Sequence, residues 1–171
     1  MNIFELFNMS RTIAIKDGNV YLADHPISIM SPDMLSDIQK RLIKEIGVEE
    51  ASKKIYGTTK KGFYNFMKEA SKHRKLNSEL EVIDWVNKLL TSTGWGKFSV
   101  EQYDPQKKII VKIENSFMAK AYGGASYACD FMLAGFLAGG LSGASESNFD
   151  AKETKCLSSG DRCCEIEVFK N

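Results

Sequence analysis

The chain has 171 residues and a formal net charge of +1, with 23 Lys and Arg residues against 22 Asp and Glu residues. This length is enough for one domain with a hydrophobic core. The balanced charge provides no strong field that would attract nucleic acid or a membrane surface. The longest apolar run, residues 126–141, contains Asp130 and is too short to span a bilayer. Residues 1–7 lack the basic start of a signal peptide, so we expect a cytoplasmic protein with reduced thiols.

The first part of the sequence predicts an apolar arm, short strands and two helices. Residues 1–10 form the arm, which we expect to dock on this domain or on a second copy of it. The strands are expected at residues 11–15, 20–23 and 27–29, with a hairpin turn at residues 17–18. The first helix begins at Pro32 and ends at Gly47. The second helix covers residues 48–71, and its glycine and threonines at residues 57–59 allow a bend.

The rest of the sequence predicts a third helix, a hairpin, a glycine-rich helix and a second hairpin. The third helix begins at residues 78–79, and the strands of the two hairpins are expected at residues 98–103, 109–114, 152–157 and 164–169. Gly135, Gly139 and Gly143 leave one face of the glycine-rich helix bare enough for another backbone to pack closely. We therefore predict an α+β fold in which a single domain, residues 11–171, packs antiparallel strands against a helical layer.

All four cysteines lie in the last quarter of the chain, which no hydrophobic pattern requires. A hairpin closed by the turn residues 158–161 brings Cys156 close to Cys163 and Cys164, and Cys129 comes from the start of the glycine-rich helix. Cys164 has the parity of the apolar residues in its strand, so it should face the core and leave Cys163 as the spare thiol. Convergent thiols of this kind indicate a metal site.

Glu153 supplies a carboxylate three residues before Cys156 and completes a candidate set of four ligands. In a regular strand it would point to the opposite face, so a bulge or the entry of the strand must turn it inward. Four such ligands suit zinc in a closed structural site, which contributes on the order of 10 kcal/mol to folding. Lys152, Lys155 and Arg162 would offset the charge of the ligands. The other interpretations are buried free cysteines that pack as small hydrophobes, or a disulfide between the two adjacent cysteines.

A spacing pattern of Cys, Gly and Glu covers residues 120–169. A cysteine precedes a glycine-rich helix, and an E-x-x-C-x7-C pattern follows, at Cys129, Glu153, Cys156 and Cys164. This pattern resembles the signature of the 4-vinyl reductase domain family. Related domains form the sensor part of aromatic-responsive transcription activators and resemble subunits of vesicle-tethering complexes. The resemblance implies that these four residues hold a structural zinc beside a buried ligand pocket, and it independently favours Cys164 among the adjacent cysteines.

Large side chains elsewhere in the chain are candidates for the wall of that pocket, although for any single one a place in the core is the simpler explanation. These candidates are Phe63, Phe66, Met67, Trp85, Trp95, Tyr122, Tyr127, Phe131 and Met132. Phenol-type sensors of the resembled family hold the hydroxyl group with a histidine. Residues 78–129 contain no histidine, which favours an apolar or lipid-like ligand. We therefore predict a zinc-stabilised module that binds or senses a small hydrophobic molecule, forms a homodimer and acts through a partner protein.

Two other functions remain as alternatives. The family name implies a reductase of a vinyl group on a tetrapyrrole, but the sequence has no nicotinamide or flavin fingerprint that would supply the hydride. A scaffold or assembly subunit, as in the tethering complexes, would use the glycine-lined helix face and the apolar arm. The only histidines are His25 and His73, both expected at the surface, and no nucleophile–base pair is visible. We therefore assign no catalytic residues.

Overall fold

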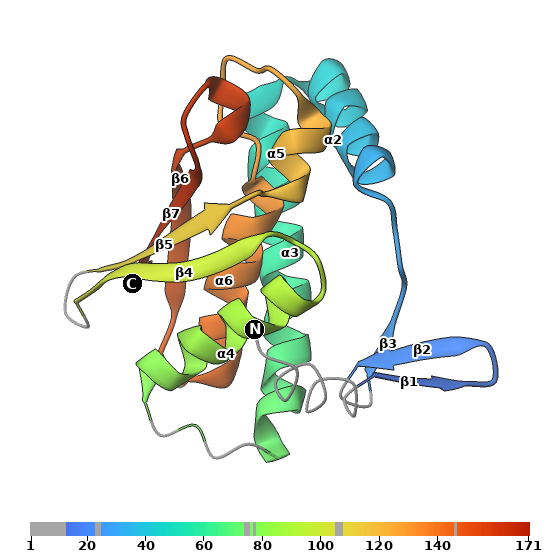
Figure 1. Ribbon diagram of the computed structural model, residues 1–171, viewed down its shortest axis with the longest axis vertical. Coiled ribbons are helices and arrows are strands. Elements are labelled where there is room, and N and C mark those ends of the chain that lie inside the picture. Colours follow the sequence, from blue (N-terminus) through green and yellow to red (C-terminus); the bar gives the residue numbers. More distant parts are fainter. Residues whose placement is uncertain (1–12, 23–24, 74–75, 77, 105–107, 146) are drawn as a thin grey trace. The chain divides into compact units, whose positions relative to one another are not determined.

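The structure is a computed structural model that describes residues 13–22, 25–73, 76, 78–104, 108–145 and 147–171 (Figure 1). The chain divides into two compact units, Met1–Ser31 and Pro32–Asn171. The described part of the first unit is an antiparallel sheet of β1 (Ile13–Lys16), β2 (Asn19–Leu22) and β3 (His25–Ile27), in that order. Asp17 and Gly18 make the first turn with φ values of 49° and 77°, as the Asp-Gly pair predicts. The arm predicted at residues 1–10 lies outside the described residues.

The second unit contains helices and an antiparallel sheet of four strands. Its helices are α2 (Pro32–Ile46), α3 (Val48–Ala70), α4 (Glu79–Ser92), α5 (Phe117–Tyr122) and α6 (Phe131–Ala144), with short 3₁₀ turns η1 (Ser71–His73) and η2 (Leu157–Ser159). Its strands are β4 (Lys97–Asp104), β5 (Lys108–Glu114), β6 (Phe149–Lys155) and β7 (Cys164–Lys170), hydrogen bonded in the order β4-β5-β7-β6. The predicted α+β class with antiparallel strands is confirmed. None of the described helices is long and apolar enough to cross a membrane.

Helix α6 lies at the centre of the second unit, in contact with α3 on one side and with β6 and β7 on another (Figure 1). Nine of its residues are buried, as expected for a helix that is apolar all round. Gly135, Gly139 and Gly143 lie so close to α3 that an added Cβ atom would collide with its backbone, at Gly139 with the carbonyl oxygen of Lys60. The bare face predicted from the glycine spacing is therefore the contact with α3.

The four-stranded sheet is apolar on the face that meets the helices and charged on the other face. In β7, residues 164, 166 and 168 are buried, which confirms the predicted alternation of that strand. Between them, Glu165 pairs with Lys155 at 2.7 Å and Glu167 pairs with Lys108 at 3.0 Å. The inward side chains of β6 and β7 therefore point toward α6, which is the side that carries the candidate metal ligands.

Three elements differ from the sequence prediction. Helix α5 is not predicted, because six residues are too few for apolar periodicity to be recognised, although Ser116 caps it by accepting a hydrogen bond from the backbone N–H of Ala119 at 3.3 Å. Helix α3 continues through residues 57–59 without a break, since a glycine costs only about 1 kcal/mol in a helix and α3 is held along its length by α6. Cys129 precedes α6 and does not lie within it.

Candidate functional site

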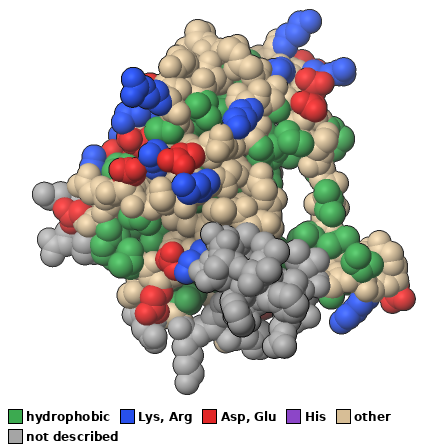
Figure 2. Space-filling model, in the orientation of Figure 1, with side chains coloured by type: hydrophobic (Ala, Val, Ile, Leu, Met, Phe, Trp, Pro, Cys, Tyr) green, Lys and Arg blue, Asp and Glu red, His purple; other side chains and the backbone are tan. Residues whose placement is uncertain are grey.

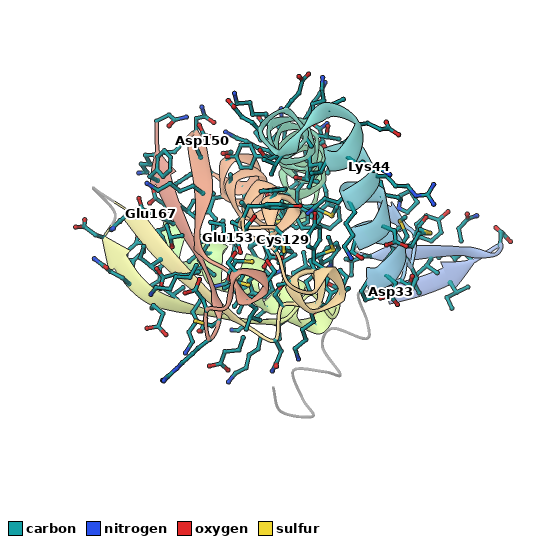
Figure 3. The ribbon with its side chains drawn as sticks, turned by 90° about the horizontal axis from the view of Figure 1, so that it is seen from above. Asp33, Lys44, Cys129, Asp150, Glu153 and Glu167 are labelled. Carbon is teal, nitrogen blue, oxygen red and sulfur yellow. The ribbon has the colours of Figure 1, made fainter. Side chains whose placement is uncertain are left out.

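The four predicted metal ligands converge in the interior of the second unit. A carboxylate oxygen of Glu153 and the Sγ atoms of Cys156 and Cys164 all lie within 4.8 Å of one another. The Sγ atom of Cys129 lies 3.6 Å from that of Cys156. Two thiolates on one tetrahedral zinc ion are about 3.8 Å apart, so this separation fits a shared ion. Figure 3 shows Cys129 and Glu153 next to each other in the interior, with sulfur atoms beside them.

An irregularity in β6 gives Glu153 and Cys156 the same orientation. Glu153 pairs with Ile166 of β7 and Lys155 pairs with Glu165, so β6 has one extra residue between the two pairs. A bulge of this kind reverses the alternation of the strand, and two residues that are three apart then point to the same side. The bulge that the parity of Glu153 requires is thus present, and it turns the carboxylate toward the thiols.

Hydrogen-bond donors surround the cluster. The backbone N–H of Asp130 donates to Oε2 of Glu153 at 2.8 Å, and a second backbone N–H donates to the sulfur of Cys164 at 3.3 Å. The hydroxyl oxygen of Ser158 lies 2.9 Å from the sulfur of Cys156. Such donors stabilise negative charge on carboxylate and sulfur atoms, which is the support that metal ligands commonly receive from their surroundings.

The second carboxylate oxygen of Glu153, Oε1, is buried and has no hydrogen-bond partner among the described residues. Burial raises the pKa of Glu153 to about 10, and the nearby charge of Asp130 adds to this increase. A buried polar atom without a partner is costly, and a cation bound to it would remove that cost. With three sulfur atoms beside this oxygen, the donor set fits zinc.

The three buried thiols are coupled to one another. Hydrogen bonds from Cys129 and then from Cys164 lower the pKa of Cys156, so the negative charge is most stable on that sulfur. The pKa values of Cys129 and Cys164 are raised, first by their hydrogen bonds to Cys156 and then by burial. All three sulfurs become negatively charged together only when a cation compensates them, which is the behaviour of a metal-binding set.

Asp130 is a fully buried carboxylate that the sequence analysis does not include in the site. Its Oδ1 accepts a hydrogen bond from the hydroxyl of Ser116 at 3.0 Å, and its Oδ2 has no partner among the described residues. Burial raises the pKa of Asp130 to about 6, and its hydrogen bond with Cys164 opposes the increase. Through its backbone bond to Glu153, Asp130 joins the starts of α5 and α6 to the cluster. Its position next to Cys129 is the only sequence signal of this role.

The basic side chains expected to offset the ligand charge are engaged elsewhere. Lys152 lies 3.4 Å from Glu167, and Lys155 lies 2.7 Å from Glu165, both on the outer face of the sheet. Arg162 is exposed in the turn before β7. Residues next to an inward-facing ligand point outward in a strand. For this reason N–H and O–H donors, rather than these lysines, surround the cluster.

All four cysteines are free in the structure, and Cys163 is the partly exposed one while the other three are buried. The structure therefore has no disulfide between Cys163 and Cys164. Cys164 faces the core with the apolar residues of β7, as its parity predicts. Metal binding by Cys129, Glu153, Cys156 and Cys164 stays a prediction.

The predicted pocket residues separate into groups, and the largest is an aromatic cluster. Phe63 and Phe66 of α3 and Trp95 pack with Phe117 of α5 and Phe136 of α6, with ring centroids 4.6–5.4 Å apart. The rings meet in offset and edge-on geometries, which aromatic side chains prefer. Each of the five side chains is only partly buried. We call these five residues the aromatic cluster.

Tyr122 and Tyr127 form a second group, which faces α2. Their hydroxyl oxygens are 2.8 Å apart, and the ammonium group of Lys40 lies 5.0 Å from the ring centroid of Tyr122. These side chains and the loop between the two tyrosines line an open groove of about 410 Å³. Below it, the side-chain amide of Gln39 donates to the carbonyl oxygen of Cys129 at 2.9 Å. Helix α2 is therefore attached directly to the segment that carries a candidate metal ligand.

The remaining pocket candidates have different surroundings. Met67 is fully buried, which agrees with the simpler explanation that it is a core residue. Phe131 and Met132 lie in the first turn of α6, and Trp85 lies on a partly exposed side of α4. Two members of the aromatic cluster, Phe117 and Phe136, are absent from the sequence prediction. Phe117 belongs to the helix that periodicity did not reveal, and the sequence does not indicate toward which neighbour Phe136 points.

Residues 109–170 match the model of the 4-vinyl reductase domain family. This part of the chain is a 4-vinyl reductase domain. The match runs from β5 to β7, so the domain includes all four candidate metal ligands and two residues of the aromatic cluster. Among curated proteins, none matches the sequence significantly.

Solved structures similar to this chain share its fold. The phenol-responsive sensory domain of the transcription activator PoxR, solved with phenol, has a TM-score of 0.84 and 18% identity, with 98% of this chain and 89% of that chain covered. A vinyl-4-reductase family protein from Methanocaldococcus jannaschii has a TM-score of 0.50 and 19% identity, with 85% and 99% covered. A trafficking protein particle complex subunit 3 from Naegleria fowleri, covalently bound to palmitic acid, has a TM-score of 0.55 and 12% identity, with 82% and 95% covered.

Proposed function

We propose that this chain is a zinc-stabilised module that binds a small hydrophobic molecule and acts as a sensor. Cys129, Glu153, Cys156 and Cys164 hold the zinc ion, and the aromatic cluster provides the main contact with the ligand. Four protein ligands leave no open position for a reactive water, so the ion contributes stability and not catalysis. The module forms a homodimer, is located in the cytoplasm and passes its signal to a partner protein.

The partial exposure of five packed aromatic rings supports the ligand-binding part of the proposal. Large aromatic side chains contribute most to stability when they are fully buried. Five of them grouped together and incompletely covered form a surface on which a flat or aliphatic molecule would be favourably placed, since small-molecule sites are mostly apolar and aromatic. The titles of two structures with the same fold name phenol and palmitic acid, which is consistent with an apolar ligand.

The metal cluster and the aromatic cluster are adjacent in the structure. The hydroxyl of Ser116 donates to Asp130, and the next residue, Phe117, packs edge-on against Trp95 with ring centroids 4.6 Å apart. Asp130 in turn donates its backbone N–H to Glu153. A zinc ion that fixes Glu153 would therefore also fix the start of α5, which carries one ring of the aromatic cluster.

The ligand class follows from the polar groups that are present. Residues 78–129 contain no histidine that would hold a phenolic hydroxyl, so we propose an apolar aromatic or lipid-like ligand instead of a phenol. Ligand binding would act as a signal through different affinities for two states of the module, because only a difference in affinity shifts a conformational equilibrium.

The direct test is to identify what the purified protein binds. We expect solvent extraction followed by mass spectrometry to release a hydrophobic molecule, and we expect naphthalene or palmitate to raise the melting temperature of the stripped protein. Phe136→Leu keeps the site apolar but removes a ring, so it should reduce the shift caused by naphthalene. Leu80→Ala, at a residue that is 45% exposed on α4, should not change it. A folded, zinc-containing protein that releases no ligand and responds to neither probe would contradict the proposal.

A further inference from the structure

Helix α2 exposes an apolar stripe and buries polar residues. Ile38 is 54% exposed and Met34 is 45% exposed, whereas Ser36 and Gln39 are each 1% exposed. Leu42 is partly exposed one turn after Ile38, on the same side of the helix. Figure 2 shows hydrophobic side chains at the surface over α2. A helix of a globular protein normally turns its apolar stripe inward, so this reversed orientation indicates a contact surface.

The orientation of α2 is fixed by contacts on its other side. The side chain of Gln39 donates to the carbonyl oxygen of Cys129 at 2.9 Å. Lys40 reaches the carbonyl oxygen of Ala121 at 3.5 Å and lies 5.0 Å from the centroid of the Tyr122 ring. Rotation of α2 to bury its apolar stripe would break these contacts. The stripe therefore stays available to a partner.

The charges of α2 favour a second copy of this chain as that partner. Asp33 and Asp37 lie in the first half of the helix, and Arg41 and Lys44 lie in the second half, all of them exposed. Spacings of three and four residues place the four side chains along one flank of the apolar stripe. Figure 3 labels Asp33 and Lys44 at opposite ends of α2. Two such helices in antiparallel orientation bring each acidic half against a basic half, whereas parallel helices bring like charges together.

We propose that α2 is the homodimer contact of this chain and packs antiparallel against α2 of a second copy, about a twofold axis near Ile38. Ile38 then meets its own counterpart, and Met34 meets Leu42 of the second copy. The twofold axis repeats each contact, so the assembly closes at two chains. The inference rests on the homodimer proposed above and names its surface. A helix of 15 residues offers a small interface, so we expect a dimer that dissociates on dilution.

Sedimentation velocity over a wide concentration range, on the zinc-loaded chain, tests the apolar part of the contact. We expect the wild type to be a dimer and Ile38→Glu to be a monomer at every concentration. The matched control is Leu80→Glu, which places the same charge at a residue of α4 that is 45% exposed, and we expect it to remain a dimer. Zinc content and circular dichroism of each variant establish that it is folded, so loss of the dimer is separated from loss of the fold.

Two charge-reversing variants test the antiparallel arrangement. Asp37→Arg and Arg41→Asp should each weaken the dimer, by about tenfold or more in Kd, because like charges then face each other twice across the axis. An equimolar mixture of the two variants should restore dimer formation, since each acidic position again faces a basic one. Pairing of residues 37 and 41 within one helix is reversed in neither chain of the mixture, so it cannot explain this recovery.

Each contrary outcome is distinguishable. A wild-type monomer at all concentrations would overturn the homodimer and this surface together, and another occupant of the stripe would then be implied. A dimer that persists in Ile38→Glu would overturn the surface but leave the homodimer intact. Weakened single variants without recovery in the mixture would overturn the antiparallel arrangement. None of these results bears on the zinc ion or the hydrophobic ligand, which are measured separately.

Discussion

The carboxylate of Glu153 receives a hydrogen bond at one oxygen and leaves the other buried without a partner among the described residues. Such an atom is unfavourable in a folded protein unless it serves a purpose. Here it lies beside the sulfurs of Cys156 and Cys164. At the scale of single residues, the unsatisfied oxygen and the coupled thiols are explained together by a bound cation.

Substitution of the two adjacent cysteines should have opposite effects on metal content. Cys164→Ser removes a buried ligand that accepts a backbone hydrogen bond, so we expect it to lose zinc and a large part of the stability of the domain. Cys163→Ser changes a partly exposed thiol and should retain one zinc per chain. Elemental analysis of the two purified variants makes the comparison. Zinc lost from Cys163→Ser and kept in Cys164→Ser would reverse the assignment.

Asp150 gives a prediction for the pH dependence of stability. Burial would raise its pKa, but hydrogen bonds from Lys60 at 2.5 Å, from Tyr56 at 2.6 Å and from Asn171 outweigh it and lower the pKa. A lowered pKa in the folded state stabilises the protein above the unfolded pKa of about 4 and ceases to do so as the pH falls through the folded value. Stability should therefore decrease in acid, and less steeply in Asp150→Asn than in the wild type.

Urea denaturation of the chelated protein at several pH values measures this difference. Chelation is needed because zinc release in acid would otherwise add its own pH dependence. The bonds of Asp150 attach β6 to α3, so the variant should also be less stable than the wild type near neutral pH. Parallel pH curves for the two proteins would show that Asp150 does not provide the coupling.

The contact between α3 and α6 gives a prediction at the scale of secondary-structure elements. Gly139→Ala adds a methyl group that collides with the carbonyl oxygen of Lys60, and the cost of such overpacking is about 1–3 kcal/mol. Gly57→Ala is the matched control, because a Cβ atom there has no neighbour within 4 Å. It should raise the free energy of unfolding by about 0.5–1 kcal/mol through helix propensity alone. Chemical denaturation of both variants is the measurement, and equal effects would refute the close packing.

The elements predicted correctly are those whose patterns depend on local chemistry. The alternation of β7 and the glycine spacing of α6 are visible in the sequence because each follows from one face of one element. The helix α5 is missed because its cap at Ser116 is the only local signal over six residues. The orientation of Glu153 required a bulge, and the sequence does not specify where a strand gains its extra residue.

The contacts between elements could not be predicted from the sequence. The bond between Ser116 and Asp130 joins residues 14 positions apart in two short segments that have no shared periodicity. The aromatic cluster draws its rings from α3, α5, α6 and the segment before β4, and only the assembled fold determines which rings meet. The expected use of Lys152 beside the ligands failed for the same reason, because a residue near in sequence faces the opposite side of the sheet.

For the whole molecule, we expect removal of the metal to weaken the entire second unit and not only its C-terminal hairpin. The candidate ligands connect β6, β7 and the start of α6, and α6 contacts α3 and α4 as well. A loss of about 4 kcal/mol or more would lower the melting temperature by roughly 10 °C in a chain of this size. Thermal unfolding with and without a zinc chelator measures the effect. An unchanged melting temperature would exclude a structural metal.

Elemental analysis combined with thiol counting on the native chain tests the central claim most directly. The account predicts one zinc ion per chain and one rapidly reactive thiol, Cys163, with the other three cysteines becoming reactive only after chelation. A folded protein that contains no metal, and whose buried thiols react at the same rate with and without chelator, would contradict it.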